Sequence, residues 1–207
     1  MALRDLSMAL RDISISLRPG TPEWPGDTPY DCRWTWQLSA GASVNVSAFS
    51  CSPHVGTHAD APLHVAEGAP AAHELPLAAF AGRARVADVR HVTGAIGFSE
   101  LGLDAQVASV PRLLLRTGRT IAEGAFPAEW PVLSPECLQR LSALGLQLVG
   151  VDCPSVDARE STDLSMHHAI FGAGAYIVEN LDLRDVEAGE YELLALPLKL
   201  EGLDAAP

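Results

Sequence analysis

The stretch Ser52-Pro53-His54-Val55-Gly56-Thr57-His58-Ala59-Asp60-Ala61-Pro62-Leu63-His64 places three of the chain's seven histidines and one aspartate within eleven residues. The intervals between positions 54, 58, 60 and 64 are all even numbers, so in an extended segment the four side chains share one face. Pro53, Gly56 and Pro62 disfavour a regular helix here. Imidazole nitrogens beside a carboxylate on one face predict a metal site rather than ordinary surface histidines.

The chemistry of these side chains limits the choice of metal. Zinc accepts imidazole nitrogen and carboxylate oxygen readily, and one aspartate can bridge two ions through its two oxygens. Manganese and iron also fit this ligand set, so the residue types alone do not fix the metal. Cys51, three positions before His54, could serve as a soft ligand, but a buried free thiol is the preferred interpretation.

A second region repeats this chemistry more weakly, in Asp163–Phe171 and Tyr176–Asn180. His167 and His168 are adjacent, and on a helix they would point about 100° apart, so at most one of them faces a given site. Glu179 ends an apolar run, where a buried carboxylate is costly without a cation. Spacing alone leaves His167 and Glu179 open between ligand and structural roles.

Composition excludes several classes of protein. The 207 residues include 26 acidic and 14 basic side chains, which gives a net charge of −12, and such a surface repels nucleic acid. No apolar run approaches the roughly 20 residues of a membrane span. The four cysteines have no zinc-finger spacing and are expected to be free thiols in a cytoplasmic protein. The segments Met1–Ser7 and Met8–Ser14 are nearly identical, and we assign no function to this duplication.

Hydrophobic patterning predicts a strand-rich chain. One helix is expected after an N-cap at Ser134, with Pro135 first and Gly145 beyond its end, a second over Met166–Phe171, and Ser99 could cap a third. Patterning alone is consistent with either an α/β or an α+β domain. Strands are predicted at Ile13–Leu17, Trp34–Leu38, Val44–Ala48, Arg83–Val89, Arg112–Thr117, Leu146–Val151, Tyr176–Glu179 and Leu193–Leu200.

The histidine stretch resembles the signature of the metal-dependent cyclase-like hydrolases, and within that family the bacterial kynurenine formamidases match best. The resemblance runs from about residue 8 to the C-terminus. It implies an α/β class of fold, the swivelling β/β/α cyclase-like fold, in which residues 1–207 form a single metal-dependent hydrolase domain. The other matching segments are Asp12–Ser14, Thr21–Pro29, Arg112–Thr117, Asp152–Asp157 and the region from His167 to Glu179.

The resemblance also assigns metal ligands by position. It implies that His54, His58 and Asp60 bind a first zinc ion and that His167 binds a second. Asp60 and Glu179 would bridge the two ions. The expected cofactor is therefore two Zn²⁺ ions per subunit, with Mn²⁺ or another divalent metal as the alternative.

Two further roles come from the same resemblance. His64 matches the proton donor and acceptor, and Trp24 matches an aromatic contact to the substrate, although a tryptophan in a Pro/Gly-rich loop could equally be a core residue. Cys153 stands where the family has a threonine, and the first seven residues are extra. Neither departure touches a motif residue.

The implied activity is hydrolysis of N-formyl-L-kynurenine to L-kynurenine and formate, a step of tryptophan breakdown, by a homodimer that binds neither nucleic acid nor membrane. Three alternatives stay open. The first is a sibling amide hydrolase acting on isatin, which would share every metal ligand. The second is a non-catalytic metal-binding protein, in which His64 would have no role in proton transfer. A structural zinc domain would normally offer a closed set of four ligands.

Overall fold

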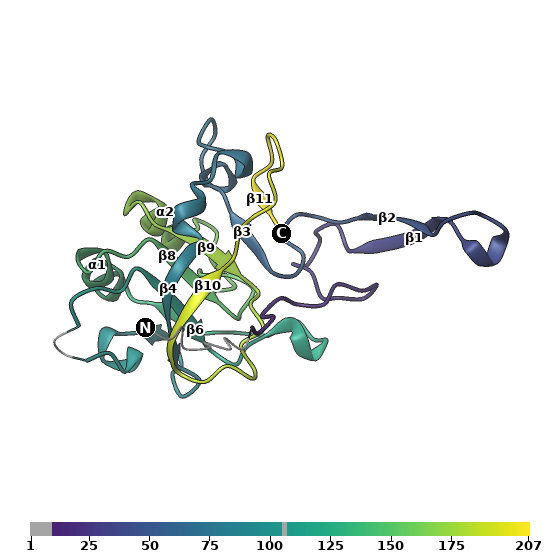
Figure 1. Cartoon of the computed structure of the whole chain (residues 1–207). Helices are drawn as coiled ribbons and strands as arrows, with labels where there is room; N and C mark the ends of the chain where they lie inside the picture. The colour runs from purple at the N-terminus through teal and green to yellow at the C-terminus, as the bar shows by residue number, and fades with distance from the viewer. Residues whose placement is uncertain (1–9, 105–106) are drawn as a thin grey trace, which may run out of the picture.

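The computed structural model describes residues 10–104 and 107–207, so the segment Met1–Ser7 lies outside the described residues. Figure 1 shows a central sheet with two helices on one side and a long hairpin projecting from the other. The α-helices and strands are β1 (Asp31–Trp36), β2 (Val46–Ser50), β3 (His58–Asp60), β4 (Ala81–Asp88), β5 (Ala95–Ile96), β6 (Arg112–Arg116), β7 (Val132–Leu133), α1 (Pro135–Ala143), β8 (Leu148–Val151), α2 (Ser165–Gly172), β9 (Tyr176–Glu179), β10 (Gly189–Leu194) and β11 (Ala205–Ala206).

The central sheet has seven strands in the order β10-β4-β6-β8-β9-β3-β11. Strands β4, β6, β8 and β9 are parallel to one another. Strand β10 pairs antiparallel with β4, and β3 pairs antiparallel with both β9 and β11. Helix α1 precedes β8 and helix α2 connects β8 to β9, because parallel neighbours need a crossover connection. The architecture confirms the strand-rich α/β class predicted from the sequence.

Both faces of the sheet are covered, which explains why the central strands are continuously apolar. One hydrophobic cluster packs α1 and α2 against the sheet, through residues such as Leu141 and Ile170. The other packs the opposite face, around Phe80 and Leu181. The sheet is therefore packed on both faces, and the ends of its strands carry side chains of the site described below.

Helix α1 begins and ends as its sequence predicts. Ser134 is the N-cap and its hydroxyl accepts a hydrogen bond from the backbone N–H of Cys137 at 3.1 Å. Pro135 occupies the first turn, where its missing N–H costs nothing. Gly145 follows the helix with φ +81°, a backbone conformation that glycine adopts freely.

Three predictions about secondary structure are wrong. Ile13–Leu17 is no strand, because the backbone N–H of Ile15 donates to the Thr57 hydroxyl at 2.8 Å instead of to a neighbouring strand. The strand expected over Leu193–Leu200 ends at Leu194. Pro197 follows shortly afterwards, and it has no backbone N–H to donate to a neighbouring strand. Ser99 caps no α-helix: it lies inside a single 3₁₀ turn, and its hydroxyl donates to Glu100 at 3.0 Å.

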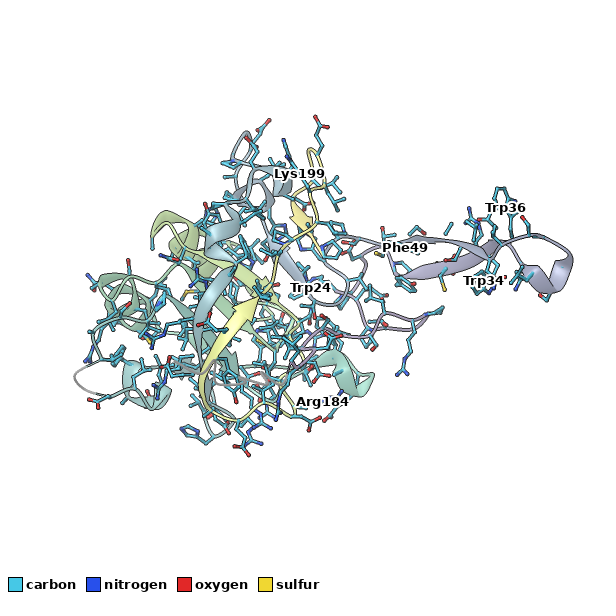
Figure 2. All side chains as sticks on the ribbon, in the orientation of Figure 1. Trp24, Trp34, Trp36, Phe49, Arg184 and Lys199 are labelled. Atoms are coloured by element: carbon cyan, nitrogen blue, oxygen red, sulfur yellow. The ribbon has the colours of Figure 1, made fainter. Side chains whose placement is uncertain are left out.

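Strands β1 and β2 form a separate antiparallel hairpin, which we call the arm. It contains the two strands expected at Trp34–Leu38 and Val44–Ala48, with shifted bounds. The arm projects from the body (Figure 1), and Trp34, Trp36 and Phe49 lie along it (Figure 2).

Neither α-helix in the described part of the chain has the length and apolarity that a membrane span requires.

Candidate metal centre

Strand β3 brings the two regions of the histidine chemistry together. It lies between β9 and β11, and His58 pairs directly opposite Glu179 in the antiparallel register. Asp60, two residues after His58, points to the same face of the sheet as His58. His167 lies in the first turns of α2, the helix that connects β8 to β9. Side chains far apart in sequence thus converge where central strands end.

The rest of the histidine stretch is not one extended segment, which corrects the sequence interpretation. Only His58–Asp60 is a strand; His54 arrives on a turn, and His64 ends a 3₁₀ helix over Pro62–His64. Gly56 allows the turn because its φ of +76° suits glycine. A Cβ added at this position would lie only 2.5 Å from Leu17 Cδ2. The predicted clustering is confirmed although the predicted backbone is not.

Three atoms form a first candidate set of metal ligands, which we call the first ligand set. His54 Nδ1 lies 3.1 Å from His58 Nε2 and 3.1 Å from Asp60 Oδ1, and His58 Nε2 lies 3.2 Å from the same oxygen. Tetrahedral zinc with bonds of about 2.0–2.1 Å separates its ligand atoms by about 3.3 Å. The three atoms are therefore spaced as ligands of one small cation.

A second ligand set adjoins the first and shares a carboxylate with it. His167 Nε2 lies 3.4 Å from Asp60 Oδ2 and 3.4 Å from Glu179 Oε1. The other oxygen of Glu179, Oε2, faces His58 Nε2 at 3.7 Å. Asp60 and Glu179 each direct one oxygen to each set, which is the arrangement that a pair of bridging carboxylates requires.

The buried polar atoms of this cluster have no hydrogen-bond partners that could replace a metal. Both oxygens of Asp60 and Nε2 of His167 are buried without a hydrogen bond, although the two side chains are almost completely inaccessible to solvent. Leaving such groups unpaired is costly. Divalent cations would satisfy all three atoms, so the residues present fit a metal centre.

Each proposed histidine ligand uses its other ring nitrogen for a hydrogen bond. Nδ1 of His58 donates to the Gly56 carbonyl at 2.9 Å, and Nδ1 of His167 donates to Asp157 at 2.6 Å. Nε2 of His54 donates to Asp204 at 3.0 Å. These bonds fix the tautomers, and they leave the lone pairs of the three remaining nitrogens directed at the two ligand sets.

The electrostatics of the cluster also favour added positive charge. Burial alone would raise the pKa of Asp60, but His58, His167 and His54 hold it well below its ordinary value. Burial would lower the pKa of His54, yet the neighbouring carboxylates of Asp204 and Asp60 raise it to about 10. The carboxylates therefore dominate this site, and metal ions must displace protons to enter it.

A pocket of about 350 Å³ opens onto the ligand sets. His64 and Trp24 both line it. Trp24 is 38% exposed, and its ring lies edge-on to Phe126 at 5.5 Å and to Trp130 at 6.2 Å. Figure 2 labels Trp24 in the region between the central sheet and the arm. The structure therefore places Trp24 in an aromatic wall of the pocket rather than in the core.

Two residues beside the ligands were missed by sequence reasoning. Asp157 accepts hydrogen bonds from the backbone N–H groups of Met166 and His167 and from the His167 ring, so it both caps α2 and orients a candidate ligand. Asp204 stands next to β11 and contacts two histidines. The resemblance region Asp152–Asp157 contained the first of these, but nothing local to residue 204 signals its role. Cys51 belongs to neither ligand set among the described residues.

The backbone is strained at the same pocket. Within the described ranges, Leu164 and Asn180 are the non-glycine residues with positive φ, at 47° and 55°. Both line the pocket, and strained residues of this kind concentrate at functional sites. The side-chain oxygen of Asn180 is buried without a hydrogen bond.

Comparison with known proteins agrees with this geometry. Residues 11–158 match the Cyclase family model, which covers well over half of the chain. The chain belongs to the cyclase family. Its relatives include a kynurenine formamidase from Bordetella avium (strain 197N), which is 43% identical over 187 residues that cover 90% of this chain and 89% of that protein.

Solved structures of cyclase-family relatives share the fold of this chain. One described as a potential metal-dependent hydrolase with cyclase activity has a TM-score of 0.78 at 30% identity, covering 95% of this chain and 93% of that one. Another, described as a predicted metal-dependent hydrolase from Bacillus stearothermophilus, has a TM-score of 0.77 at 29% identity, covering 95% of this chain and 94% of that one. Isatin hydrolase A from Labrenzia aggregata, at 23% identity and a TM-score of 0.79, covering 95% and 90%, shows the same fold.

Proposed function

We propose that this cyclase-family chain is an arylformamidase that hydrolyses N-formyl-L-kynurenine to L-kynurenine and formate, a step of tryptophan breakdown. The observation that carries the proposal is the 43% identity to a kynurenine formamidase over 90% of the chain. The paired ligand sets beside an aromatic-walled pocket support it, since a formamide needs strong activation of water near neutral pH.

Within this proposal, His54, His58, Asp60, His167 and Glu179 hold two zinc ions, with Mn²⁺ as the alternative metal. The spacing of the ligand atoms supports a small cation in each set. Two such ions, when bound, lower the pKa of water toward about 7 and polarise a carbonyl oxygen. The contribution of the protein is to hold these five side chains in place around the two ions.

His64 is the proposed acid and base. Its Nδ1 faces Asp204 at 3.3 Å, so Nε2 is free in a pocket that also opens onto the ligands. Nε2 takes a proton from water as the formyl carbon is attacked, and it returns that proton to the aryl nitrogen as the C–N bond breaks. Imidazole suits both transfers because its ordinary pKa is about 6.5.

Trp24 is the proposed contact to the aryl ring of the substrate. Phe126 and Trp130 hold its indole edge-on, so a ring entering the pocket finds the aromatic surface already oriented. Offset stacking of that kind contributes about 0.5–1.5 kcal/mol beyond the burial of apolar area.

The decisive experiment combines metal analysis with an assay of N-formylkynurenine hydrolysis, before and after complete chelation. We expect about two divalent ions per chain, loss of turnover on chelation and its return when Zn²⁺ is restored. Isatin serves as the comparison substrate and should be hydrolysed far more slowly. Turnover that persists after full metal removal would overturn the metal-dependent mechanism, and a preference for isatin would overturn the substrate.

We also propose that the chain acts as a homodimer through the arm. Isolated two-stranded hairpins are only marginally stable in water, yet this arm exposes Trp34, Trp36 and Phe49 by 55%, 58% and 66%. Clustered exposed aromatics of this kind mark interaction surfaces. A second copy is the proposed occupant because homo-oligomers with two-fold symmetry are the commonest assemblies.

The dimer can be tested by sedimentation of the purified protein. The parent chain should sediment as a dimer at micromolar concentration, and the double variant Trp34→Ser/Trp36→Ser should sediment as a monomer with unchanged helix and strand content. Leu77→Ser is the matched control, because Leu77 is 57% exposed and lies off the arm. A monomeric parent, or a double variant as dimeric as the parent, contradicts the proposal.

The single-domain organisation of residues 1–207 is likewise proposed, supported by two hydrophobic clusters that pack on one shared sheet. The cytoplasmic location expected from the sequence stays a prediction.

A further inference from the structure

We propose that Asp204 is a positioning residue that holds the imidazole of His64 in the tautomer needed for proton transfer. The inference rests on the proposed function, because it deepens the role given to His64. Asp204 contributes no atom to the two ligand sets around Asp60, and it acts through the two histidines that it contacts, His54 and His64.

The contacts of one carboxylate oxygen carry this inference. Oδ2 of Asp204 lies 3.3 Å from Nδ1 of His64 and 3.0 Å from Nε2 of His54. The two imidazole rings lie with their centroids 4.3 Å apart. Asp204 therefore links a proposed metal ligand to the proposed acid and base, and it determines how the two rings face each other.

The main chain fixes Asp204 in place independently of its side chain. Its carbonyl accepts a hydrogen bond from the N–H of Ala61 at 2.9 Å, and the next residue, Ala205, pairs with Asp60 across β11 and β3. Ala205 and Ala206 are completely buried. A substitution at residue 204 that keeps the backbone should consequently leave the strand pairing intact.

The chemical consequence concerns the two tautomers of neutral imidazole. A carboxylate at Nδ1 favours the form that carries its proton there, which leaves the Nε2 lone pair available as a base. Oδ2 of Asp204 lies within hydrogen-bond distance of both rings, and an ionised carboxylate can only accept such bonds. Without it, His64 is free to rotate and to populate the other tautomer.

Asp204 could instead be read as a metal ligand, because His54, His64 and Asp204 lie close enough together to hold an ion. Two observations favour the positioning role. The ring nitrogen of His54 nearest to His58 and Asp60 already faces the first ligand set. The side chain of Asp204 is 42% exposed, unlike the buried carboxylates Asp60 and Glu179.

The main test is the isosteric variant Asp204→Asn in the zinc-loaded enzyme. We expect kcat to fall by about 10–100-fold, the usual effect of losing such an orienting partner, while KM changes by less than about twofold and two metal ions are retained. In a His64→Ala background, with zinc at saturation so that His54 keeps its ion, Asp204→Asn should cause no further loss of kcat, because its effect on turnover passes through His64. Glu201→Gln, an exposed charge in the same C-terminal segment, is the control.

A readout independent of activity accompanies the kinetics. The ring-nitrogen NMR spectrum of isotope-labelled histidine in zinc-loaded protein should show His64, assigned by its absence in His64→Ala, with its proton on Nδ1 in the parent and a tautomer mixture in Asp204→Asn. An unchanged tautomer, losses that multiply in the double variant, or a third ion that disappears with Asp204 would each overturn the proposal. A parent that shows the tautomer but does not hydrolyse N-formylkynurenine would refute the proposed substrate and leave the positioning role standing.

Discussion

Replacing His64 by alanine should leave the metal content unchanged and lower kcat by about 10²–10⁴-fold, the usual contribution of a general acid–base group. The metal stays because His64 is not part of either ligand set that includes Asp60: those sets consist of His54, His58 and Asp60, and of Asp60, His167 and Glu179. Turnover falls because no other side chain in the proposed mechanism can transfer the proton between water and the leaving aryl amine.

The measurement is a pair of numbers on the same sample: zinc per chain and kcat with N-formylkynurenine. His168→Ala is the matched control, since His168 is an exposed histidine next to a proposed ligand on α2 and its loss should change neither number. Turnover at the parental rate in His64→Ala would refute the role of His64. Loss of metal together with activity would mean that His64 is itself a ligand.

Replacing Glu179 by glutamine should weaken metal binding by more than about 100-fold. Loss of an outer-shell partner alone costs about 10–100-fold, and Glu179 is proposed to bind both ions directly. Its two oxygens face His58 at 3.7 Å and His167 at 3.4 Å, whereas glutamine offers one oxygen and no charge. The backbone N–H of Val156, which donates to Oε1 at 2.8 Å, would keep the single remaining oxygen.

Thermal unfolding with and without zinc separates this effect from a folding defect. A ligand that binds only the native state raises the melting temperature, so zinc should stabilise the parent markedly and the Glu179→Gln variant much less. Glu187→Gln removes an exposed charge a few residues along the chain and should behave like the parent. Two ions bound with parental affinity in Glu179→Gln would contradict the bridging role.

The sequence predicted those parts of the fold whose signals are local. Strand β9 was placed at its observed bounds because Tyr176–Glu179 is an apolar run buried by both layers. The start of helix α1 could be predicted because Ser134 and Pro135 form a typical N-terminal cap. Ile13–Leu17 alternates like a strand, but its hydrogen bonds go to a side chain and to a loop, a choice that depends on tertiary structure. Strand β3 has three residues, too few for any periodicity to reveal.

The same distinction holds for the site. His54, His58 and Asp60 could be identified because their spacing within one short stretch is itself the signal. Asp204 could not, because it lies 150 positions from His54 and is one of many acidic residues in the chain. Only the pairing of β11 with β3 brings it to the histidines.

The two ligand sets differ in how much of the chain must be in place before each is complete. The first draws on residues 54–60, which meet through a single turn. The second joins Asp60 to His167 and Glu179, so it closes a loop of more than half the chain and depends on β9 having paired with β3. Closing long loops costs more entropy. We therefore expect the second set to be lost before the first when the protein begins to unfold, because only the second draws its ligands from distant parts of the chain.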